Sequence, residues 1–435
     1  MSIWAWRWQI DRQSSPDRCR FEFSRENLLG FEKTTVERVD GIDLRNLPYA
    51  ARNQPFGTRP GRKQRWLSQN ENTLTAELVS DARTIVSKSA RSATVLSAVP
   101  RYRLIRSAPS ADITWDVLSS STKTANRRRS AMKSVGILFP GQGAQAIGMG
   151  RWLRKTHPVA NSLFDQASEV LGYDLGELCA SGPESQLNET AYSQPALFVV
   201  GIAAATVMQE QAPERIAAVK AAAGLSLGEY TAVCFAGGLD FSDGLRLVQR
   251  RGQAMQAAAD AVESGMASVL GLDLDAVKQL CDDSRQEGEV LQPANLLCPG
   301  NIAVSGHLTA IERLVPAAEA AGAMKVIPLS VAGAFHTSLM QPAVEALRAA
   351  LEEIPIQNTQ IPVYSNVDAK PHQSASEIRD LLSRQVVGSV RWEDSVRQML
   401  EDGIDGFEEV GTGRVLRGTL KRINRKLPSD GFGDG

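Results

Sequence analysis

The feature that most constrains this chain is the heptapeptide Gly224-Leu225-Ser226-Leu227-Gly228-Glu229-Tyr230, which contains the pattern Gly-x-Ser-x-Gly. A mostly apolar run, Ile216 to Ala223, precedes it, and a helix-favouring run, Leu227 to Phe235, follows it. Together they predict a nucleophile elbow, a sharp turn from strand to helix with a strained serine at its tip. Ser226 would then lie at the amino end of a helix, where free amides and the helix dipole stabilise an oxyanion.

The composition bounds the classes of function. With 435 residues, of which 43% are hydrophobic, the chain can hold two or three domains or one large domain with an insertion. A net charge of −1 argues against electrostatic binding to nucleic acid. We find no apolar run of transmembrane length and no secretory signal, so we expect no membrane association.

Cysteine and histidine usage argues against metal and disulfide sites. The five cysteines are widely spaced without a C-x-x-C pattern, and the four histidines show no H-E-x-x-H pattern. We therefore predict a reducing compartment and no metal. We also expect no bound cofactor.

Residues 1–131 differ from the rest of the chain. They carry five of the seven tryptophans and 23 basic against 13 acidic residues, whereas the whole chain is almost neutral. An Arg- and Ser-rich segment of this kind is typical of an organellar transit region, although residues 1–45 carry eight charges of each sign. Alternatively, translation begins at Met132. On either interpretation we expect a disordered extension outside the catalytic unit.

From residue 134 onward the pattern is that of an α/β sheet. Val135 to Phe139 predicts a buried strand, and apolar runs and amphipathic helices then alternate through Leu197 to Val200. Gly141 to Ala146 imitates a dinucleotide fingerprint, but the acidic residue at the expected spacing, Asp165, falls within a predicted helix, so we reject that interpretation. After the elbow, Ser242 is predicted to cap a helix that runs to about Val262.

Two adjacent arginines in that helix have different predicted environments. Leu247, Arg251 and Met255 form one row at helical spacing beside the packed face, whereas Arg250 lies on the wetter side. An unpaired guanidinium on a packed face is costly, so Arg251 requires an anionic partner. That partner is either a structural carboxylate or a ligand.

Residues 263–331 form a unit of their own. Strands and helices are predicted in the order βαββαβ, which is the ferredoxin-like plan. We therefore expect an inserted small subdomain within a large α/β-hydrolase-like subdomain made of residues 132–262 and 332–427, with residues 428–435 as a tail. Clefts between such units are common ligand sites.

His336 is the best candidate for a general base. It follows Gly333-Ala334-Phe335 in a loop that precedes a predicted helix, and a lone histidine is more often structural than catalytic. Paired with an exposed serine upstream, however, it can activate that serine. Near the end of the chain, Gly411-Thr412-Gly413 predicts a tight turn, since the lysine spacing of a phosphate-binding loop is missing.

Five motifs occur in an informative order over about residues 133–427. They are Phe139-Pro140-Gly141-Gln142-Gly143-Ala144-Gln145, the elbow, Arg251-Gly252, Gly333-Ala334-Phe335-His336 and Glu409-Val410-Gly411-Thr412-Gly413. The set resembles the malonyl-CoA:acyl-carrier-protein transacylases of fatty acid synthesis. Each motif alone is weak, but five in order are highly specific.

The resemblance implies a set of catalytic roles. Ser226 corresponds to the nucleophile and His336 to its base. Gln142 and the backbone amide of Leu227 correspond to the oxyanion hole. Gln385 matches the position whose backbone carbonyl orients the histidine.

The resemblance also implies the substrate. Arg251 corresponds to the guanidinium that holds the malonyl carboxylate, Asn295 to a pocket asparagine, and Phe335 to a residue typical of malonyl-selective members. Leu225 departs from the family, in which a histidine usually precedes the nucleophile and shapes the acyl pocket without acting as the base.

The implied activity is transfer of malonyl from malonyl-CoA to the phosphopantetheine thiol of acyl carrier protein through a malonyl-serine, with ping-pong kinetics. Acyl transfer between two thiols that use one pocket needs such a covalent intermediate. The alternatives are a serine hydrolase or thioesterase and a non-catalytic carrier-binding module. We expect a cytoplasmic monomer, or an organellar protein of the stroma or matrix if residues 1–131 are a transit region.

Overall fold

The computed structural model describes residues 132–433 together with six short strands nearer the amino terminus. The chain divides into two compact units, Met1–Thr124 and Ala125–Gly435. In the first unit, three antiparallel pairs are described, namely β1 (Ser24–Asn27) with β2 (Gly30–Lys33), β3 (Arg38–Val39) with β4 (Ile42–Asp43), and β5 (Arg103–Leu104) with β6 (Trp115–Asp116). Apart from these strands, the prediction for residues 1–131 lies outside the described residues.

The second unit is built on a six-stranded sheet in the order β14-β13-β8-β7-β15-β16. The strands are β7 (Val135–Phe139), β8 (Val219–Gly224), β13 (Val363–Tyr364), β14 (Pro371–His372), β15 (Gly406–Val410) and β16 (Ser429–Phe432). All neighbours are parallel except β13 and β14. The α/β class predicted from the sequence is confirmed.

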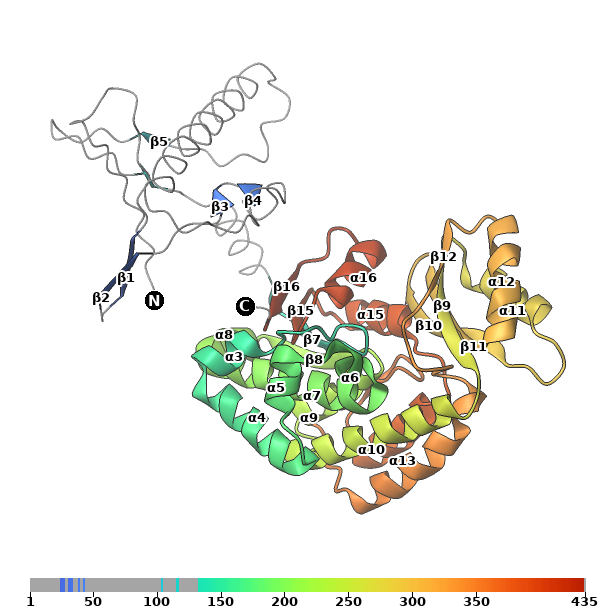
Figure 1. The fold of residues 1–435 in the computed structure, drawn as a ribbon, viewed down its shortest axis with the longest axis horizontal. Helices are drawn as coiled ribbons and strands as arrows, with labels where there is room; N and C mark the ends of the chain where they lie inside the picture. Colours follow the sequence, from blue (N-terminus) through green and yellow to red (C-terminus); the bar gives the residue numbers. More distant parts are fainter. Residues whose placement is uncertain are drawn as a thin grey trace, which may run out of the picture. The chain divides into compact units, whose positions relative to one another are not determined.

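The four inner strands of this sheet, β13, β8, β7 and β15, contribute side chains to two cores, one on each face. In β7, Ile137 and Phe139 belong to one core whereas Leu138 belongs to the other, because successive side chains of a strand point to opposite faces. Helices α4 (Pro158–Leu171), α7 (Thr190–Gln211), α9 (Leu227–Phe235) and α10 (Phe241–Asp260) cover the larger core, and helices α15 (Trp392–Glu401) and α16 (Val415–Ile423) cover the smaller one (Figure 1). Both faces are therefore buried, which is the usual condition of a parallel sheet.

Among the described residues, twelve α-helices accompany the six-stranded sheet. They are α3 (Arg151–Thr156), α4 (Pro158–Leu171), α5 (Leu175–Ser181), α6 (Glu184–Asn188), α7 (Thr190–Gln211), α8 (Pro213–Ala217), α9 (Leu227–Phe235), α10 (Phe241–Asp260), α13 (Gln341–Glu353), α14 (Ala375–Gln385), α15 (Trp392–Glu401) and α16 (Val415–Ile423), with a short 3-10 helix, η3, at Ser338–Met340.

Helix α7 differs from the other helices in being apolar on all sides. Among the described residues it is the one helix long and apolar enough to cross a membrane, which the sequence analysis did not anticipate, and 83% of its apolar window is buried inside the protein. A core helix passes the same test, because a helix packed on every side needs no polar face.

Three expectations from the sequence are wrong. The apolar run Leu197 to Val200 is the buried middle of α7 rather than a separate run between helices. Helix α10 takes Asp240 as its N-cap residue, and Ser242 lies inside the helix, where its Oγ accepts a hydrogen bond from the Gln166 side chain. Residues 428–435 are no tail, because Ser429–Phe432 forms β16 beside β15, and Phe432 packs against the larger core.

A second sheet contains four antiparallel strands in the order β10-β11-β9-β12. Its elements, in chain order, are β9 (Ser264–Leu270), α11 (Leu274–Ser284), β10 (Leu291–Cys298), β11 (Asn301–His307), α12 (Leu308–Ala320) and β12 (Lys325–Pro328). The observed order, βαββαβ, is the one predicted from the sequence. Helices α11 and α12 pack on one face of this sheet around a third core.

Candidate active site

The elbow forms where β8 ends and α9 begins. Ser226 connects them with φ 50° and ψ −101°, a strained conformation for a residue with a side chain. A Cβ on Gly224 would lie 1.9 Å from the carbonyl carbon of Gly228, and one on Gly228 would lie 2.1 Å from the carbonyl oxygen of Phe139. Both glycines are therefore required by close packing, and the predicted turn is confirmed.

The Asn366 side chain holds this turn through two hydrogen bonds. Its Oδ1 accepts from the Ser226 backbone N–H at 2.7 Å, and its Nδ2 donates to the Gly224 carbonyl at 2.9 Å. Asn366 is fully buried just after β13, the strand beside β8. The sequence analysis missed it, because no local pattern marks a contact across 140 residues.

Ser226 and His336 form a hydrogen-bonded pair. Ser226 Oγ lies 2.8 Å from His336 Nε2, and His336 Nδ1 lies 2.9 Å from the backbone carbonyl of Gln385. Since a carbonyl only accepts, Nδ1 carries the proton and Nε2 is left as the acceptor for the serine hydroxyl. Burial and the Arg251 charge lower the His336 pKa to about 4, so the imidazole is held neutral.

Arg251 completes the cluster from α10. Its Nη2 donates to Ser226 Oγ at 3.0 Å and to Gln385 Oε1 at 2.9 Å, and its Nη1 donates to Gln194 Oε1 at 2.7 Å. The guanidinium is only 1% exposed and lies 5.0 Å from the Tyr230 ring centroid. Burial lowers its pKa.

No carboxylate pairs with Arg251 in the described part of the chain. All its side-chain acceptors are neutral, and within the same range its Nε has no hydrogen-bond partner. The row predicted from the sequence is correct, since Leu247, Arg251 and Met255 are all buried. This buried cation beside the strained Ser226 can therefore accept an anion as a further hydrogen-bond partner.

Comparison with known proteins identifies the family. The model of the acyl transferase domain matches residues 137–425. The chain belongs to the acyl transferase domain family.

Several relatives of this acyl transferase carry a common name. The chain is 40% identical over 303 residues to the malonyl CoA-acyl carrier protein transacylase of Bacillus subtilis, covering 70% of this chain and 94% of the relative. It is 39% identical over 311 residues to the mitochondrial malonyl-CoA-acyl carrier protein transacylase of Homo sapiens, covering 69% and 80%. A solved malonyl-transacylase in complex with a type II PKS acyl-carrier protein matches with a TM-score of 0.67, 40% identity and coverage of 69% and 96%.

Four other predicted residues of this acyl transferase make no side-chain hydrogen bond to the Ser226–His336 pair. Gln142, in the loop after β7, donates from Nε2 to Thr190 Oγ1 at 3.3 Å, and Leu227 is the first residue of α9. Phe335 is buried next to His336 in the chain. Asn295 lies on β10, and its buried Oδ1 has no hydrogen-bond partner among residues 132–433.

Glu229 is a further buried charge that the sequence analysis did not single out, although it stands inside the elbow motif. Its Oε2 accepts from Gln385 Nε2 at 2.7 Å and from the Asn366 backbone N–H at 3.0 Å. Burial raises its pKa to about 7, against the effect of these hydrogen bonds. An acidic residue within the otherwise apolar first turns of a core helix was the available signal.

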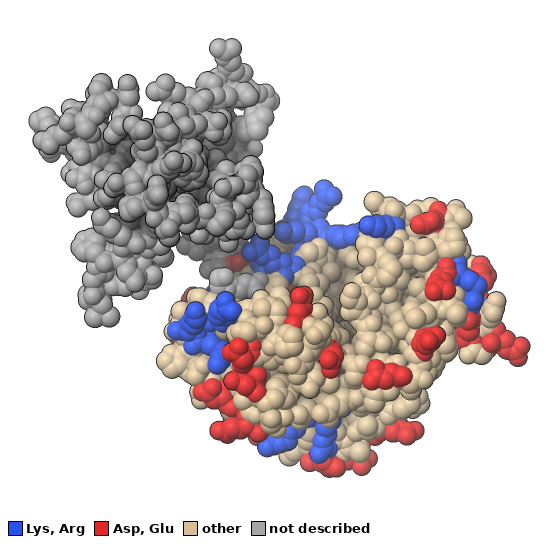
Figure 2. Space-filling view, in the orientation of Figure 1, with Lys and Arg blue, Asp and Glu red and all other residues tan. Residues whose placement is uncertain are grey.

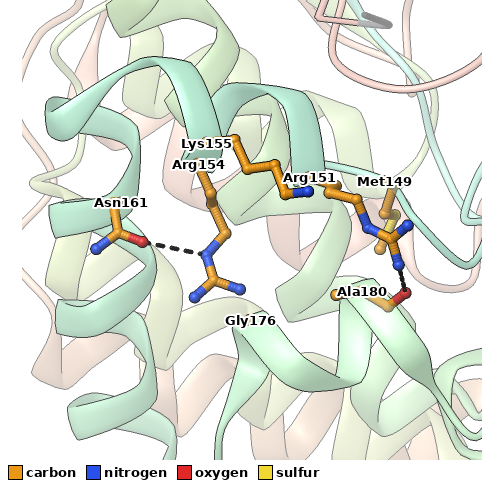
Figure 3. Close-up of a pocket in the computed structure, with 7 residues that line it drawn as sticks. All are labelled: Met149, Arg151, Arg154, Lys155, Asn161, Gly176 and Ala180. Carbon is orange, nitrogen blue, oxygen red and sulfur yellow. Dashed lines mark hydrogen bonds between the residues drawn. The ribbon is translucent and has the colours of Figure 1, made fainter. Parts of the chain in front are cut away.

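A separate cavity of about 270 Å³ lies among α3, α4 and α5. It is lined by Met149, Arg151, Arg154, Lys155, Asn161, Gly176 and Ala180, none of them a predicted site residue (Figure 3). Arg154 donates to Asn161 Oδ1 at 3.4 Å and Arg151 to the Ala180 carbonyl at 2.8 Å, so two of its three cations are partly satisfied within the protein.

Two findings bear on metal and nucleic-acid binding. Over the described residues, no group of three or more His, Cys, Asp and Glu side chains could hold a metal ion. Figure 2 shows Lys and Arg in a few separate groups on the visible face, with Asp and Glu scattered between and around them. That face carries no continuous basic surface of the kind that binds nucleic acid.

Proposed function

We propose that this chain transfers a malonyl group from malonyl-CoA to the phosphopantetheine thiol of acyl carrier protein, through a malonyl ester on Ser226. The family and the names of its relatives support this reaction. The observation that carries the proposal is the buried Arg251 guanidinium. It lies 3.0 Å from the nucleophile and has no carboxylate partner in the described chain.

The first half-reaction acylates the serine. His336 Nε2 takes the proton of Ser226 Oγ as the oxygen attacks the thioester carbonyl. The imidazolium then returns that proton to the departing CoA sulfur, and the ester remains on the enzyme. The neutral His336 held by the Gln385 carbonyl is in the protonation state that this step requires.

The second half-reaction repeats these steps in reverse. The carrier thiol gives its proton to His336 and attacks the malonyl-serine carbonyl, and Ser226 leaves with the proton. In both halves the negative oxygen is held by Gln142 and by the backbone N–H of Leu227. As the first residue of α9, Leu227 has no intrahelical partner for its amide.

Arg251 selects the acyl group by binding its free carboxylate. A guanidinium presents paired N–H donors that match a carboxylate better than an ammonium does. Phe335 and Asn295 complete the acyl pocket, and the unpartnered Asn295 Oδ1 is an acceptor for a donor on the substrate. Leu225, 8% exposed before the nucleophile, packs in the smaller core.

The two other candidate functions predict different chemistry. A serine hydrolase or thioesterase commonly orients its histidine with a carboxylate, whereas His336 Nδ1 bonds a backbone carbonyl. A non-catalytic carrier-binding module has no need of a strained serine bonded to a histidine. Both alternatives are therefore disfavoured.

Several further features belong to the same proposal. The four-stranded sheet is an inserted ferredoxin-like subdomain, supported by its strand order, within an α/β-hydrolase-like subdomain that includes β16. The catalytic unit begins at about residue 132. The enzyme acts as a monomer, without a bound cofactor or metal and away from membranes. It is cytoplasmic or, alternatively, lies in an organelle, since the name of the human relative describes that protein as mitochondrial.

Incubation with malonyl-CoA and phosphopantetheinylated acyl carrier protein tests the function. A malonyl transferase increases the mass of the carrier by one malonyl group, at a rate that depends on the enzyme. A hydrolase releases malonate and leaves the carrier unchanged. A binding module produces neither product, and either of these two results would overturn the proposal.

A further inference from the structure

The side chain of Gln385 stands between two buried charges. Its Nε2 donates to Glu229 Oε2 at 2.7 Å and to the Ser226 carbonyl at 2.9 Å, while its Oε1 accepts from Arg251 Nη2 at 2.9 Å. Gln385 and Arg251 are each 1% exposed, and Glu229 is 3% exposed. These bonds are separate from the backbone carbonyl of Gln385, which holds His336.

Glu229 determines which end of that amide faces Arg251. A carboxamide has a donor end and an acceptor end of similar shape, and a rotation of its terminal bond exchanges them. An ionised carboxylate only accepts, as does the Ser226 carbonyl, so Gln385 must turn its NH₂ toward both. Its oxygen is thereby directed at Arg251. The reversed amide would set N–H donors against N–H donors in a buried site.

The guanidinium is in this way held by neutral acceptors on two sides. Gln194 Oε1 accepts a hydrogen bond from Arg251 Nη1, and Gln385 Oε1 accepts one from Arg251 Nη2. A carboxylate in direct contact with Arg251 would compete with an anionic substrate, whereas Glu229 acts on Arg251 through the intervening amide. The geometry therefore fixes the arginine without neutralising it.

We propose that Glu229 and the side chain of Gln385 are positioning residues for Arg251, and that they set the preference of the enzyme for acyl groups that carry a carboxylate. This inference rests on the proposed function, in which Arg251 binds the malonyl carboxylate. The backbone carbonyl of Gln385 then orients His336, and its side chain positions Arg251.

The test compares kcat/KM for malonyl-CoA and acetyl-CoA at about pH 8, with thermal melting as a check on folding. Gln385→Met removes both ends of the amide, keeps a side chain of similar length and retains the carbonyl that holds His336. Glu229→Gln keeps the size and removes the charge. Gln279→Met, the same substitution on the exposed part of α11, is the matched control.

We expect Gln385→Met to lower the malonyl-to-acetyl ratio of kcat/KM about tenfold, mainly through a higher KM for malonyl-CoA, because a hydrogen bond to a charged group is lost. Glu229→Gln shifts the ratio in the same direction by a smaller factor. Loss of the bond to the Ser226 carbonyl weakens the reaction of both thioesters, so it cancels in the ratio. The control leaves the ratio unchanged.

The outcome is decided with Arg251→Ala as reference. If the positioning residues act through Arg251, adding Gln385→Met to Arg251→Ala lowers the ratio no further. If Arg251→Ala lowers the ratio while Gln385→Met and Glu229→Gln leave it unchanged, the inference is wrong and the proposed function stands. If Arg251→Ala itself leaves the ratio unchanged, both are wrong. Should Gln385→Met fail to fold, the ratio for Glu229→Gln decides alone.

Discussion

Replacement of Arg251 by alanine tests the choice of substrate. The guanidinium is 1% exposed, lies beside Ser226 Oγ and has no carboxylate partner among the described residues, so in the acyl transferase it is available to the malonyl carboxylate. Removing one member of a desolvated, hydrogen-bonded charge pair costs about 2–5 kcal/mol. At about 1.4 kcal/mol per factor of ten, kcat/KM for malonyl-CoA should fall roughly 30- to 4,000-fold.

Acetyl-CoA provides the internal comparison, because it has no carboxylate for Arg251 to bind. Its kcat/KM should change far less and could rise, since the variant removes an unpaired buried charge. Arg250→Ala is the matched control. Arg250 stands next in the chain but is half exposed and pairs with Glu353 on the surface, an interaction worth at most about 1 kcal/mol.

The assay is the initial rate of acyl transfer at several concentrations of each thioester, for the wild type and the two arginine variants. Melting curves establish that each variant is folded. An equal fall for both thioesters in Arg251→Ala would show that Arg251 only supports the structure of the site. The proposal of malonyl selectivity would then lose its main physical support.

Three further predictions concern the base, the buried carboxyl and the chain before the catalytic unit. His336→Ala should slow serine acylation without abolishing it. In a pH–rate profile, the wild-type rate should fall only near pH 4, because burial and the Arg251 charge lower the His336 pKa to about 4, and Arg251→Ala should move this fall to higher pH. Burial raises the pKa of Glu229 from 4.5 to about 7, so its contribution to stability is present at low pH and is lost as the pH rises. The melting temperature of Glu229→Gln should therefore rise relative to that of the wild type between pH 4.5 and 7, and a constant difference would contradict this. A variant beginning at Met132 should fold and transfer malonyl near the full-length rate, and an insoluble or inactive product would show that residues 1–131 are needed.

The sequence was sufficient for the elements of the fold that depend on local patterns. The run Val135 to Phe139 and the helix Leu227 to Phe235 have the predicted ends, because apolar periodicity and the elbow glycines determine them. Strand β16 was missed, since Ser-Asp-Gly-Phe has no alternation and pairs only because the edge of β15 is available. Helix α7 is apolar all round, so periodicity alone could not distinguish its middle from a buried strand.

In the candidate site, too, some residues could be predicted from the sequence and others could not. The row on α10 predicted a buried Arg251 that needs a partner. The loop position of His336 and the serine upstream of it predicted the base, and the resemblance to a known family supplied Gln385. Neither route identified Asn366, because its importance arises from the packing of β13 against β8. The partners of buried polar groups depend on tertiary contacts, which no local pattern records.

In the proposed reaction, Ser226 carries the acyl group between the two thiols. The most direct measurement is intact-protein mass spectrometry after incubation with malonyl-CoA and without acyl carrier protein, followed by peptide mapping. We expect one malonyl group on Ser226 in the wild type, which is lost when the carrier thiol is added, and no adduct in a folded Ser226→Ala variant. An adduct that persists in Ser226→Ala, or no adduct in the wild type while the carrier is still malonylated, would contradict it.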